Sequence, residues 1–491
     1  MQTQGNTSGA PAGVDAKFEV RVGAAAGSGG VDAPLTLAVG TVDITPSVPR
    51  WPSLWMGGYA GGPRGNHGDV ARTLRAHCVV FYDQGTPNVL LRADIVHIPR
   101  DVHQAVRSRI VDAGLVADSA DFMMMASHTH SGMYVGDTTP NPFIMMNLQP
   151  ADIDAINLST QILIDLLVQL VTDTLQVPPV AVTLGYAEGN TTIGYNRVDM
   201  PTVLSTVPVL LARAVSDNSP VALVFGYACH AVARGNDEVF DSDYCGEAAE
   251  QVERWLGVPA LFLQGTAGDQ QPADPQSPDQ VANLGDQLAR TIADVVVHGA
   301  FTPVTGPFAT QLTEVDLPFT VDTSKASVRN QLRTRYQQRV NDNPPTEYVN
   351  RHAQVMLGQL DDGTLPTSIP MPIQCWKLGG LTIMGLAHEA LSVYDGAVKA
   401  LMPGKKVWVL GYTNEVACYV PGDEVSWAGG SKHFGYEAGW TDDPTITGEN
   451  TAPMFFAWPA PLRFSPVGTT PPAVGSTQRI VLDACRTLLT G

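Results

Sequence analysis

Positive charge is scarce in this sequence, which has 29 Lys and Arg residues against 48 Asp and Glu residues and a formal net charge of −19. A protein that binds a nucleic-acid backbone needs a concentrated basic surface, so this balance argues against a nucleic-acid partner. Charged residues make up only 16% of the chain and hydrophobic residues 44%. This composition is typical of a globular protein with a large buried core.

Cysteine pairs and long apolar runs are also missing. The six cysteines include no C-x-x-C pair, so their spacing indicates neither a zinc knuckle nor a dense disulfide framework. No run of 18 apolar residues occurs, and we therefore expect no transmembrane segment. The N-terminus lacks the basic and apolar regions of a secretory signal, which favours a cytoplasmic location.

Several familiar catalytic motifs are absent as well. The pair His388 and Glu389 is followed by Ala-Leu-Ser, so it does not form the H-E-x-x-H motif of zinc proteases. There is no G-x-S-x-G segment, which argues against a nucleophile elbow, and no glycine-rich phosphate-binding loop. Any catalytic residues must therefore lie outside these motifs.

The chain divides into a short tail and one long folded region. Residues 1–34 are rich in glycine, alanine and serine and are expected to form a flexible N-terminal tail. Residues 35–491 are expected to form a single catalytic domain, because strand-like and helical runs alternate through them without an internal repeat. This alternation predicts an α/β fold of mixed β-sheets with flanking helices.

Apolar periodicity predicts the individual elements. Three hairpins are indicated by pairs of apolar runs that flank a turn, at residues 77–98, 207–230 and 373–389. Helical spacing predicts helices over residues 151–175, 243–256, 279–298, 327–340 and 477–489. Residues 427–474 are rich in Gly, Pro, Trp and Asp and are expected to form a long ordered loop, and such loops tend to be functional.

Four apolar runs end in residues of chemical interest, and this repetition is the main functional signal. The runs are FMMMASHTH, LVFGYACH, ALFLQGTAGD and LTIMGLAHE, and their ends supply His128, His130, His230, Asp269 and Glu389. If these strands share a sheet, their ends can converge at one edge. Two histidines and a carboxylate with an open fourth position form the usual hydrolytic zinc site, so we expect a metal site at the strand ends.

Each of these residues also has a structural alternative. A histidine at the end of a strand is often hydrogen-bonded to nearby backbone, and this interpretation stays open for His230. Glu389 could instead cap the helix expected after it, because a carboxylate is favourable at a helix N-terminus. Its neighbour His388 competes for the same role. His128 and His130 are stronger candidates, because alternate residues of an extended segment share a face.

The order of these motifs resembles the catalytic domain of the neutral, non-lysosomal ceramidases. The segments that carry the resemblance are GTVDITP, MGGYAGG, SHTHSG, YACHAVA, TAGDQQP, IMGLAHE and GYEAG. They fall in the family's order from about residue 38 to residue 440. The resemblance implies a hydrolase that holds zinc with His128, His230, Glu389 and Tyr436.

The resemblance also assigns roles around the metal. His130 is expected to face the substrate, where it would stabilise the developing oxyanion or relay a proton. Arg197, in GYNRVD, lies where the family has an asparagine-arginine segment and is expected to meet a substrate carbonyl. Apart from the resemblance, Asp269 or Gln271 is expected to orient the attacking water or a histidine.

Two departures from the family bear on the substrate. The family's nucleophilic serine is replaced by Gln271, whose amide cannot form an acyl-enzyme, so hydrolysis is expected to use a zinc-activated water. The chain also stops about 50 residues beyond GYEAG, where the family continues into an immunoglobulin-like domain. A smaller or more soluble amide than ceramide is therefore expected as substrate.

The expected function is zinc-dependent hydrolysis of the C–N bond of a small-molecule amide. An esterase or lactonase is one alternative, because amide and ester hydrolysis pass through the same tetrahedral oxyanion. A catalytically silent, ceramidase-like binding protein is another, favoured by the loss of the serine. Nothing in the sequence predicts an oligomeric state.

Overall fold

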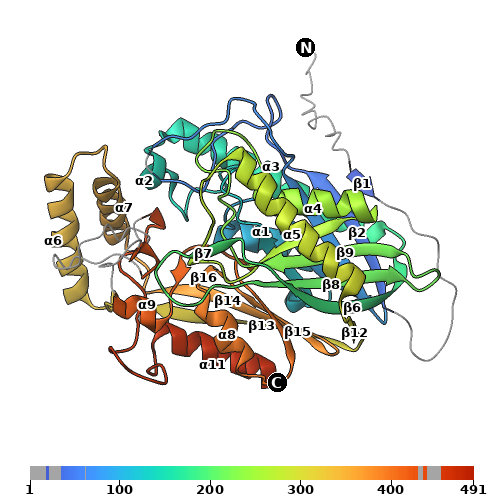
Figure 1. Ribbon diagram of the computed structural model, residues 1–491. Coiled ribbons are helices and arrows are strands. Elements are labelled where there is room, and N and C mark those ends of the chain that lie inside the picture. The colour runs from blue at the N-terminus through green and yellow to red at the C-terminus, as the bar shows by residue number, and fades with distance from the viewer. Residues whose placement is uncertain (1–17, 21–34, 61, 429–434, 439–454, 491) are drawn as a thin grey trace, which may run out of the picture.

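Two β-sheets packed face to face, with helices on the outer face of each, form the body of the protein (Figure 1). The computed structural model describes residues 18–20, 35–60, 62–428, 435–438 and 455–490. The predicted α/β fold of mixed sheets with flanking helices is confirmed.

The larger sheet has ten strands among the described residues and mixes parallel with antiparallel pairs. Its main path runs in the order β10 (Ala260–Gln264), β9 (Pro220–Tyr227), β8 (Thr206–Ala214), β6 (Val180–Asn190), β2 (Thr36–Asp43), β3 (Arg75–Asp83), β4 (Thr86–Ala93) and β5 (Phe122–Ala126). Two short strands join it: β1 (Phe18–Val20) pairs with β2, and β12 (Thr302–Val304) pairs with β6.

The smaller sheet packs against one face of the larger one. Its order is β13 (Phe308–Pro318), β14 (Ser368–Leu378), β15 (Leu381–Leu386) and β17 (Lys406–Leu410). Alternation along β3 directs Phe81 toward this interface and Val80 toward the opposite face. Trp376 and Trp408 fill the interface from the smaller sheet, and burial of such large aromatic side chains stabilises the sheet pair.

Helices cover the two outer faces. The larger sheet is covered by α1 (Arg100–Asp112), α3 (Pro150–Gln176), α4 (Asp243–Leu256) and α5 (Pro278–His298). The smaller sheet is covered by α8 (Val393–Lys399) and α11 (Thr477–Thr490). At one end, α2 (Pro142–Met146), α6 (Ala326–Asp342) and α7 (Tyr348–Asp362) share a separate apolar cluster (Figure 1).

Short elements lie near the strand ends that the sequence singled out. They are β7 (Gly194–Asn196) paired with β11 (Gln270–Pro272), β16 (Glu389–Ala390) paired with β18 (Tyr419–Val420), α9 (Asp423–Ala428) and η3 (Gly435–Ala438). The short helix η1 (Ser119–Asp121) instead precedes β5. The edge strands β5 and β10 of the larger sheet also contact each other, so the sheet curls toward closure. This curling brings the segments after β5 and β9 together, and a bridge links Thr129 to Ala231.

The three predicted hairpins are confirmed as β3–β4, β8–β9 and β14–β15. The five predicted helices correspond to α3, α4, α5, α6 and α11, whereas two long helices, α1 and α7, were missed along with the short α2 and α9. Both of the missed long helices are rich in polar residues and bury only a few apolar side chains, such as Val102 and Val106 of α1.

Some expectations need correction or fall partly outside the described chain. The four strands that precede the candidate site residues do not share one sheet. Strands β5, β9 and β10 belong to the larger sheet and β15 to the smaller one. Within the predicted tail, Phe18–Val20 form β1, and within the predicted loop 427–474 short helical segments occur; much of both ranges lies outside the described residues.

The expected absence of a membrane-spanning segment also needs a qualification. By length and composition alone, α3 could cross a membrane, although half of its apolar window is buried in the fold. Leu163, Leu167 and Leu170 of α3 pack against the larger sheet. That packing is typical of a core helix, so α3 is only weak evidence for a membrane span.

Candidate active site

The segment after β5 carries His128 and His130 into the interior. His128 has a φ of 64°, in the left-handed region that residues other than glycine seldom occupy. Its backbone N–H donates to the carbonyl of Ile95 at 3.0 Å, and the N–H of His130 donates to the carbonyl of Ala231 at 3.0 Å. Backbone bonds from two different strand ends therefore hold this turn, and the two imidazole rings stand nearly perpendicular, 4.7 Å apart.

His230, which follows β9, meets His128 at the centre of the site. The Nδ1 atom of His230 lies 2.8 Å from the carbonyl oxygen of Ala267, and Nδ1 of His128 lies 2.6 Å from that of Val96. A carbonyl oxygen only accepts, so each Nδ1 carries a hydrogen and each Nε2 of the neutral ring presents a lone pair. Burial, followed by the charge of Arg197, lowers the pKa of His230 to about 3.

Glu389 faces these two lone pairs from the smaller sheet. Its Oε2 lies 3.3 Å from Nε2 of His128 and 3.2 Å from Nε2 of His230. Burial raises the pKa of Glu389, but the two histidines outweigh it and hold that pKa well below its ordinary value. The hydroxyl of Tyr412 donates to the same oxygen at 3.3 Å, and burial keeps the pKa of this phenol high, so it remains a donor.

The atoms that converge here are complementary to a cation. Because each Nδ1 donates to a backbone carbonyl, the Nε2 atoms of His128 and His230 both face one carboxylate oxygen, and lone pairs on these atoms repel that oxygen unless a positive charge lies between them. Two ligands held at about 2.1 Å by a tetrahedral zinc ion lie about 3.4 Å apart. The contacts of 3.2 and 3.3 Å between Glu389 and the two histidines match that separation.

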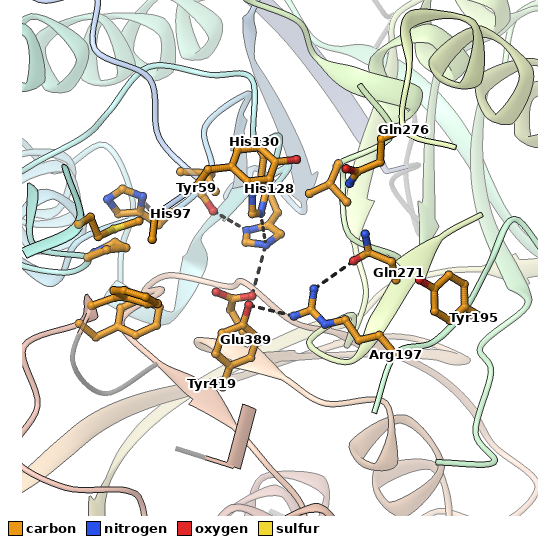
Figure 2. Close-up of a pocket in the computed structure, with 18 residues that line it drawn as sticks. Tyr59, His97, His128, His130, Tyr195, Arg197, Gln271, Gln276, Glu389 and Tyr419 are labelled. Carbon is orange, nitrogen blue, oxygen red and sulfur yellow. Dashed lines mark hydrogen bonds and ion pairs between the residues drawn. The ribbon is translucent and has the colours of Figure 1, made fainter. Parts of the chain in front are cut away.

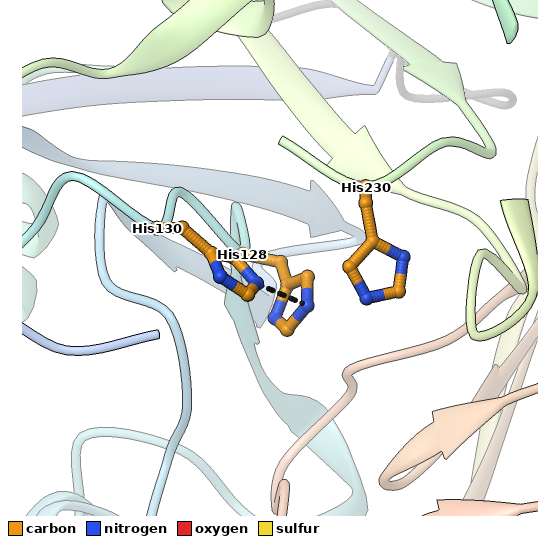
Figure 3. A group of neighbouring side chains, drawn as sticks. All are labelled: His128, His130 and His230. Atoms are coloured by element: carbon orange, nitrogen blue, oxygen red, sulfur yellow. Dashed lines mark hydrogen bonds between the residues drawn. The ribbon is translucent and has the colours of Figure 1, made fainter. Parts of the chain in front are cut away.

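Two sets of side chains at this centre could hold a metal ion. In one, His128, His130 and His230 offer nitrogen atoms that all lie within 4.8 Å of one another (Figure 3). In the other, Glu389 replaces His130. The Nδ1 atoms of His128 and His230 are fixed by backbone carbonyls, as is usual for metal-bound histidines, whereas the buried Nδ1 of His130 has no partner among the described residues.

A cavity of about 350 Å³ opens beside the histidines and Glu389. Figure 2 shows His97 at one end of it and Arg197 with Gln271 at the other, with His128, His130 and Glu389 between. The remaining wall is largely apolar and includes Val96, Pro140, Met145, Val232, Phe455 and Phe456. A mainly apolar cavity with a few placed polar groups is the usual form of a small-molecule site.

Arg197 is fixed at its end of the cavity by several acceptors. Its Nε donates to Glu437 at 2.6 Å, its Nη1 to Oε1 of Gln271 at 3.1 Å, and its Nη2 to the hydroxyl of Tyr419 at 3.1 Å. The Tyr419 hydroxyl also lies 3.4 Å from Nε2 of His230. Arg197 therefore links Gln271 to the histidine centre through Tyr419.

The structure brings most of the predicted residues to the cavity. His128, His130, Arg197, Gln271 and Glu389 line the cavity, and His230 lies beside it. His388 is turned away, with Nε2 3.0 Å from the carbonyl of Pro370. Glu389 precedes α8 but faces the histidines, so the helix-capping alternative does not describe its contacts.

Asp269 lies behind the cavity wall rather than on it. Its carboxylate accepts from the Asn196 side chain at 2.8 Å and from the N–H and hydroxyl of Ser392 at 2.8 and 2.7 Å. These bonds join β7 to the chain after β16, so Asp269 braces the strand that presents Gln271. The side chain of Tyr436, predicted as a zinc ligand, lies outside the described part of the structure.

Sequence reasoning missed several residues of this site. Tyr412 and Tyr419 contact Glu389 and His230, and His97 and Tyr59 line the cavity. Tyr59 stands in the MGGYAGG segment, which the sequence singled out only for its resemblance. The other three stand in no motif: His97 and Tyr412 lie in the segments that follow β4 and β17, and Tyr419 lies in the short strand β18. Their positions depend on tertiary packing, which spacing along the sequence does not encode.

One glycine in that segment is required by close approach. Gly58 has a φ of +104°, and a Cβ placed on it would lie 2.6 Å from Cγ and Nδ1 of His130. Only glycine fits this backbone conformation without strain and leaves room for the ring. Gly58 therefore sets the position of the His130 imidazole.

No protein-family model matches the sequence, and no curated protein matches it significantly. Among solved structures, the neutral ceramidase from Pseudomonas aeruginosa matches with a TM-score of 0.62 at 17% identity, over 87% of this chain and 73% of that one. A ceramidase complexed with C2 matches with a TM-score of 0.61 at 17% identity, over 87% and 74%. The resemblance inferred from the sequence is thus confirmed for the fold: this chain has a neutral-ceramidase-like fold.

Proposed function

We propose that this protein is a zinc-dependent amidohydrolase that acts on a small amide. The observation that carries the proposal is the convergence of the Nε2 atoms of His128 and His230 on one carboxylate oxygen of Glu389, at 3.3 and 3.2 Å, beside a cavity. The two solved structures described above are ceramidases, and a ceramidase cleaves an amide bond, which supports the reaction class.

We assign the ligand set to His128, His230 and Glu389, with Tyr436 as the further ligand implied by the resemblance. When bound there, zinc would polarise the scissile carbonyl and make water a stronger nucleophile near neutral pH. His130 is left to face the substrate, since it lines the cavity and no backbone carbonyl fixes its ring. From this position it can move a proton between the attacking water and the leaving amine.

In this proposal, the end of the cavity that holds Arg197 and Tyr419 binds and orients the scissile carbonyl of the substrate. The Tyr419 hydroxyl and the guanidinium of Arg197 are both hydrogen-bond donors, and they lie next to His230. Donors held in place before reaction stabilise the oxyanion that develops on the carbonyl oxygen. Glu437 and the carbonyl of Gly268 fix Arg197, so little reorganisation is needed during the reaction.

Gln271 serves as a hydrogen-bond donor in this scheme. A guanidinium only donates, so Arg197 Nη1 fixes the amide of Gln271 with Oε1 toward it and leaves the Nε2 hydrogens for another acceptor. This role needs no covalent intermediate, in keeping with a glutamine at the position of the family's serine. A cavity of about 350 Å³ lies at the small end of the range for ligand sites, which favours a substrate smaller than ceramide.

Metal content and a matched pair of histidine variants test the proposal. We expect about one zinc per chain in the purified protein, and loss of both zinc and amide hydrolysis in His128→Ala. His103→Ala is the control, because His103 is a buried histidine that faces a glutamate outside the cavity. Its Nδ1 lies 3.0 Å from Glu415. Zinc and activity that survive His128→Ala would refute the proposal.

A second measurement separates amide from ester hydrolysis. Matched amide and ester substrates with the same acyl group would be compared by kcat/KM with the zinc-loaded protein. We expect turnover of the amide. Turnover of esters alone would make the protein an esterase or lactonase, and bound zinc with every substrate intact would make it a binding protein.

A further inference from the structure

His97 is a cavity residue for which the proposed reaction has no use. It lies in the segment between β4 and α1, and its side chain is 2% exposed. Its neighbour Val96 supplies the carbonyl that fixes His128, so the same turn places both histidines. Figure 2 shows His97 at the end of the cavity away from Arg197 and Gln271.

The tautomer of His97 follows from its contacts. Its Nε2 lies 2.8 Å from the carbonyl oxygen of Val135, which can only accept, so Nε2 carries the hydrogen. The ring also packs edge-on against Tyr134 at 5.4 Å, and the hydroxyl of Tyr134 donates to the carbonyl of Pro140 at 2.8 Å. The imidazole is therefore locked, with the lone pair on Nδ1.

That lone pair has no partner. Among the described residues nothing donates to Nδ1 of His97, although the atom is buried. Burial also lowers the pKa of His97 to about 4, so the ring is neutral at neutral pH and Nδ1 stays an acceptor. A buried acceptor without a donor is unfavourable, and a ligand that supplies one gains affinity.

A second buried histidine, His352, has the same kinds of contact as His97 and serves as a comparison. Its Nε2 lies 2.9 Å from the carbonyl of Trp458, its ring packs edge-on against Tyr336, and its Nδ1 is buried without a partner. The two histidines thus share their hydrogen bonding, but only His97 lines the cavity. The position of His97, together with its free acceptor, is what distinguishes it.

We propose that Nδ1 of His97 accepts a hydrogen bond from an N–H or O–H group in the arm of the substrate that extends from the scissile amide along the apolar wall. This inference rests on the proposed function and narrows its substrate class. Along a wall that includes Val96, Pro140 and Met145, one fixed acceptor selects an apolar arm with a single donor at a set distance from the metal.

Paired hydroxamic acids test this selection by binding rather than by turnover. A hydroxamate directs the probe to the metal, and alkyl arms of increasing length would end in either an acetamide or the acetate ester of the same shape. Dissociation constants would be measured by calorimetry with the zinc-loaded protein. At one arm length we expect the acetamide to bind about tenfold more tightly than the ester.

Two variants assign that preference to His97. His97→Phe keeps the ring but removes both nitrogens, and we expect it to bind the two probes equally. His352→Phe makes the same change outside the cavity, and we expect it to keep the preference. A preference that survives in His97→Phe would overturn the inference.

The wild-type protein decides the question even if His97→Phe does not fold. Methylation of the acetamide nitrogen must then abolish the preference. If acetamide and ester bind equally at every arm length, this inference fails alone and the metal site stands. If no hydroxamate binds, the proposed metal chemistry fails, and this inference fails with it.

Discussion

The Glu389→Gln substitution tests directly whether the carboxylate and histidines form a metal centre or a structural ion pair. The change replaces one carboxylate oxygen by an N–H donor and leaves the shape of the side chain nearly the same. In the wild type, Oε2 of Glu389 faces two Nε2 atoms at 3.2 and 3.3 Å. In the variant the amide can donate to one of those lone pairs, but it is a poor ligand for zinc.

The expected magnitudes follow from linkage and chain length. Zinc at a thousandfold excess over its Kd stabilises the wild type by about 4 kcal/mol. For 491 residues the entropy of unfolding is about 1 kcal/mol per kelvin, so the Tm should rise by about 4 °C. In Glu389→Gln we expect this rise to vanish, while the new hydrogen bond raises the Tm of the metal-free protein by about 1 °C.

Calorimetric unfolding of dialysed and zinc-loaded protein measures both quantities. Glu415→Gln is the matched control, because Glu415 is equally buried and faces His103 and Arg100 at 3.0 and 2.9 Å outside the cavity. We expect this control to lose about 1.5 to 3 kcal/mol and to keep its response to zinc. A Glu389→Gln protein that loses stability like the control and still responds to zinc would refute the metal assignment.

Three further tests address two residues beside the histidines and the stability of the protein at acid pH. Gly58→Ala puts a Cβ 2.6 Å from the His130 ring, so we expect an about tenfold lower kcat in amide-hydrolysis assays with unchanged zinc content. Tyr419→Phe should lower kcat about ten- to hundredfold with little change in KM. Burial lowers the pKa of His352 from 6.5 to about 3, so unfolding takes up a proton between these values. As pH falls through this window, the free energy of unfolding should drop by about 1.4 kcal/mol per pH unit, and His352→Phe should flatten that slope in urea titrations.

Each of these tests has a control or a contrary result. Gly85 has a similar φ of +85° with nothing within 4 Å of an added Cβ, so Gly85→Ala carries the backbone strain without the clash. Loss of zinc in Gly58→Ala would place His130 among the ligands. An unchanged kcat in Tyr419→Phe would remove Tyr419 from the reaction, and an unchanged slope in His352→Phe would show that its ring is charged when folded.

Apolar periodicity and turn residues predicted the elements whose formation depends on neighbouring residues. Hairpins such as β3–β4 and the long helix α3 follow from apolar periodicity and turn residues. The convergence of His128, His130, His230 and Glu389 was predicted because all follow buried strands. The sheet to which β15 belongs was not, because strand pairing across a long stretch of sequence depends on packing that periodicity does not encode.

The missed site residues share a physical reason. Tyr412, Tyr419 and His97 act through contacts between the two sheets or through an unfilled hydrogen bond, and neither leaves a trace in spacing. The partner of Arg197, Glu437, lies in η3, far along the chain. Asp269 was predicted in the site because it follows a buried strand. In the structure its carboxylate accepts hydrogen bonds from Asn196 and Ser392 and so connects two segments behind the cavity wall.

The closure of the larger sheet has a consequence for how the protein folds. His128 and His230 come together only when the β5 and β10 edges meet, and Glu389 joins them only when the smaller sheet has docked. Such long-range contacts form slowly, since much chain entropy is lost before they stabilise the fold. If zinc binds as proposed, its uptake during refolding would report the docking of the two sheets, and a chain still emerging from the ribosome would bind metal only after β15 and β16 had been made.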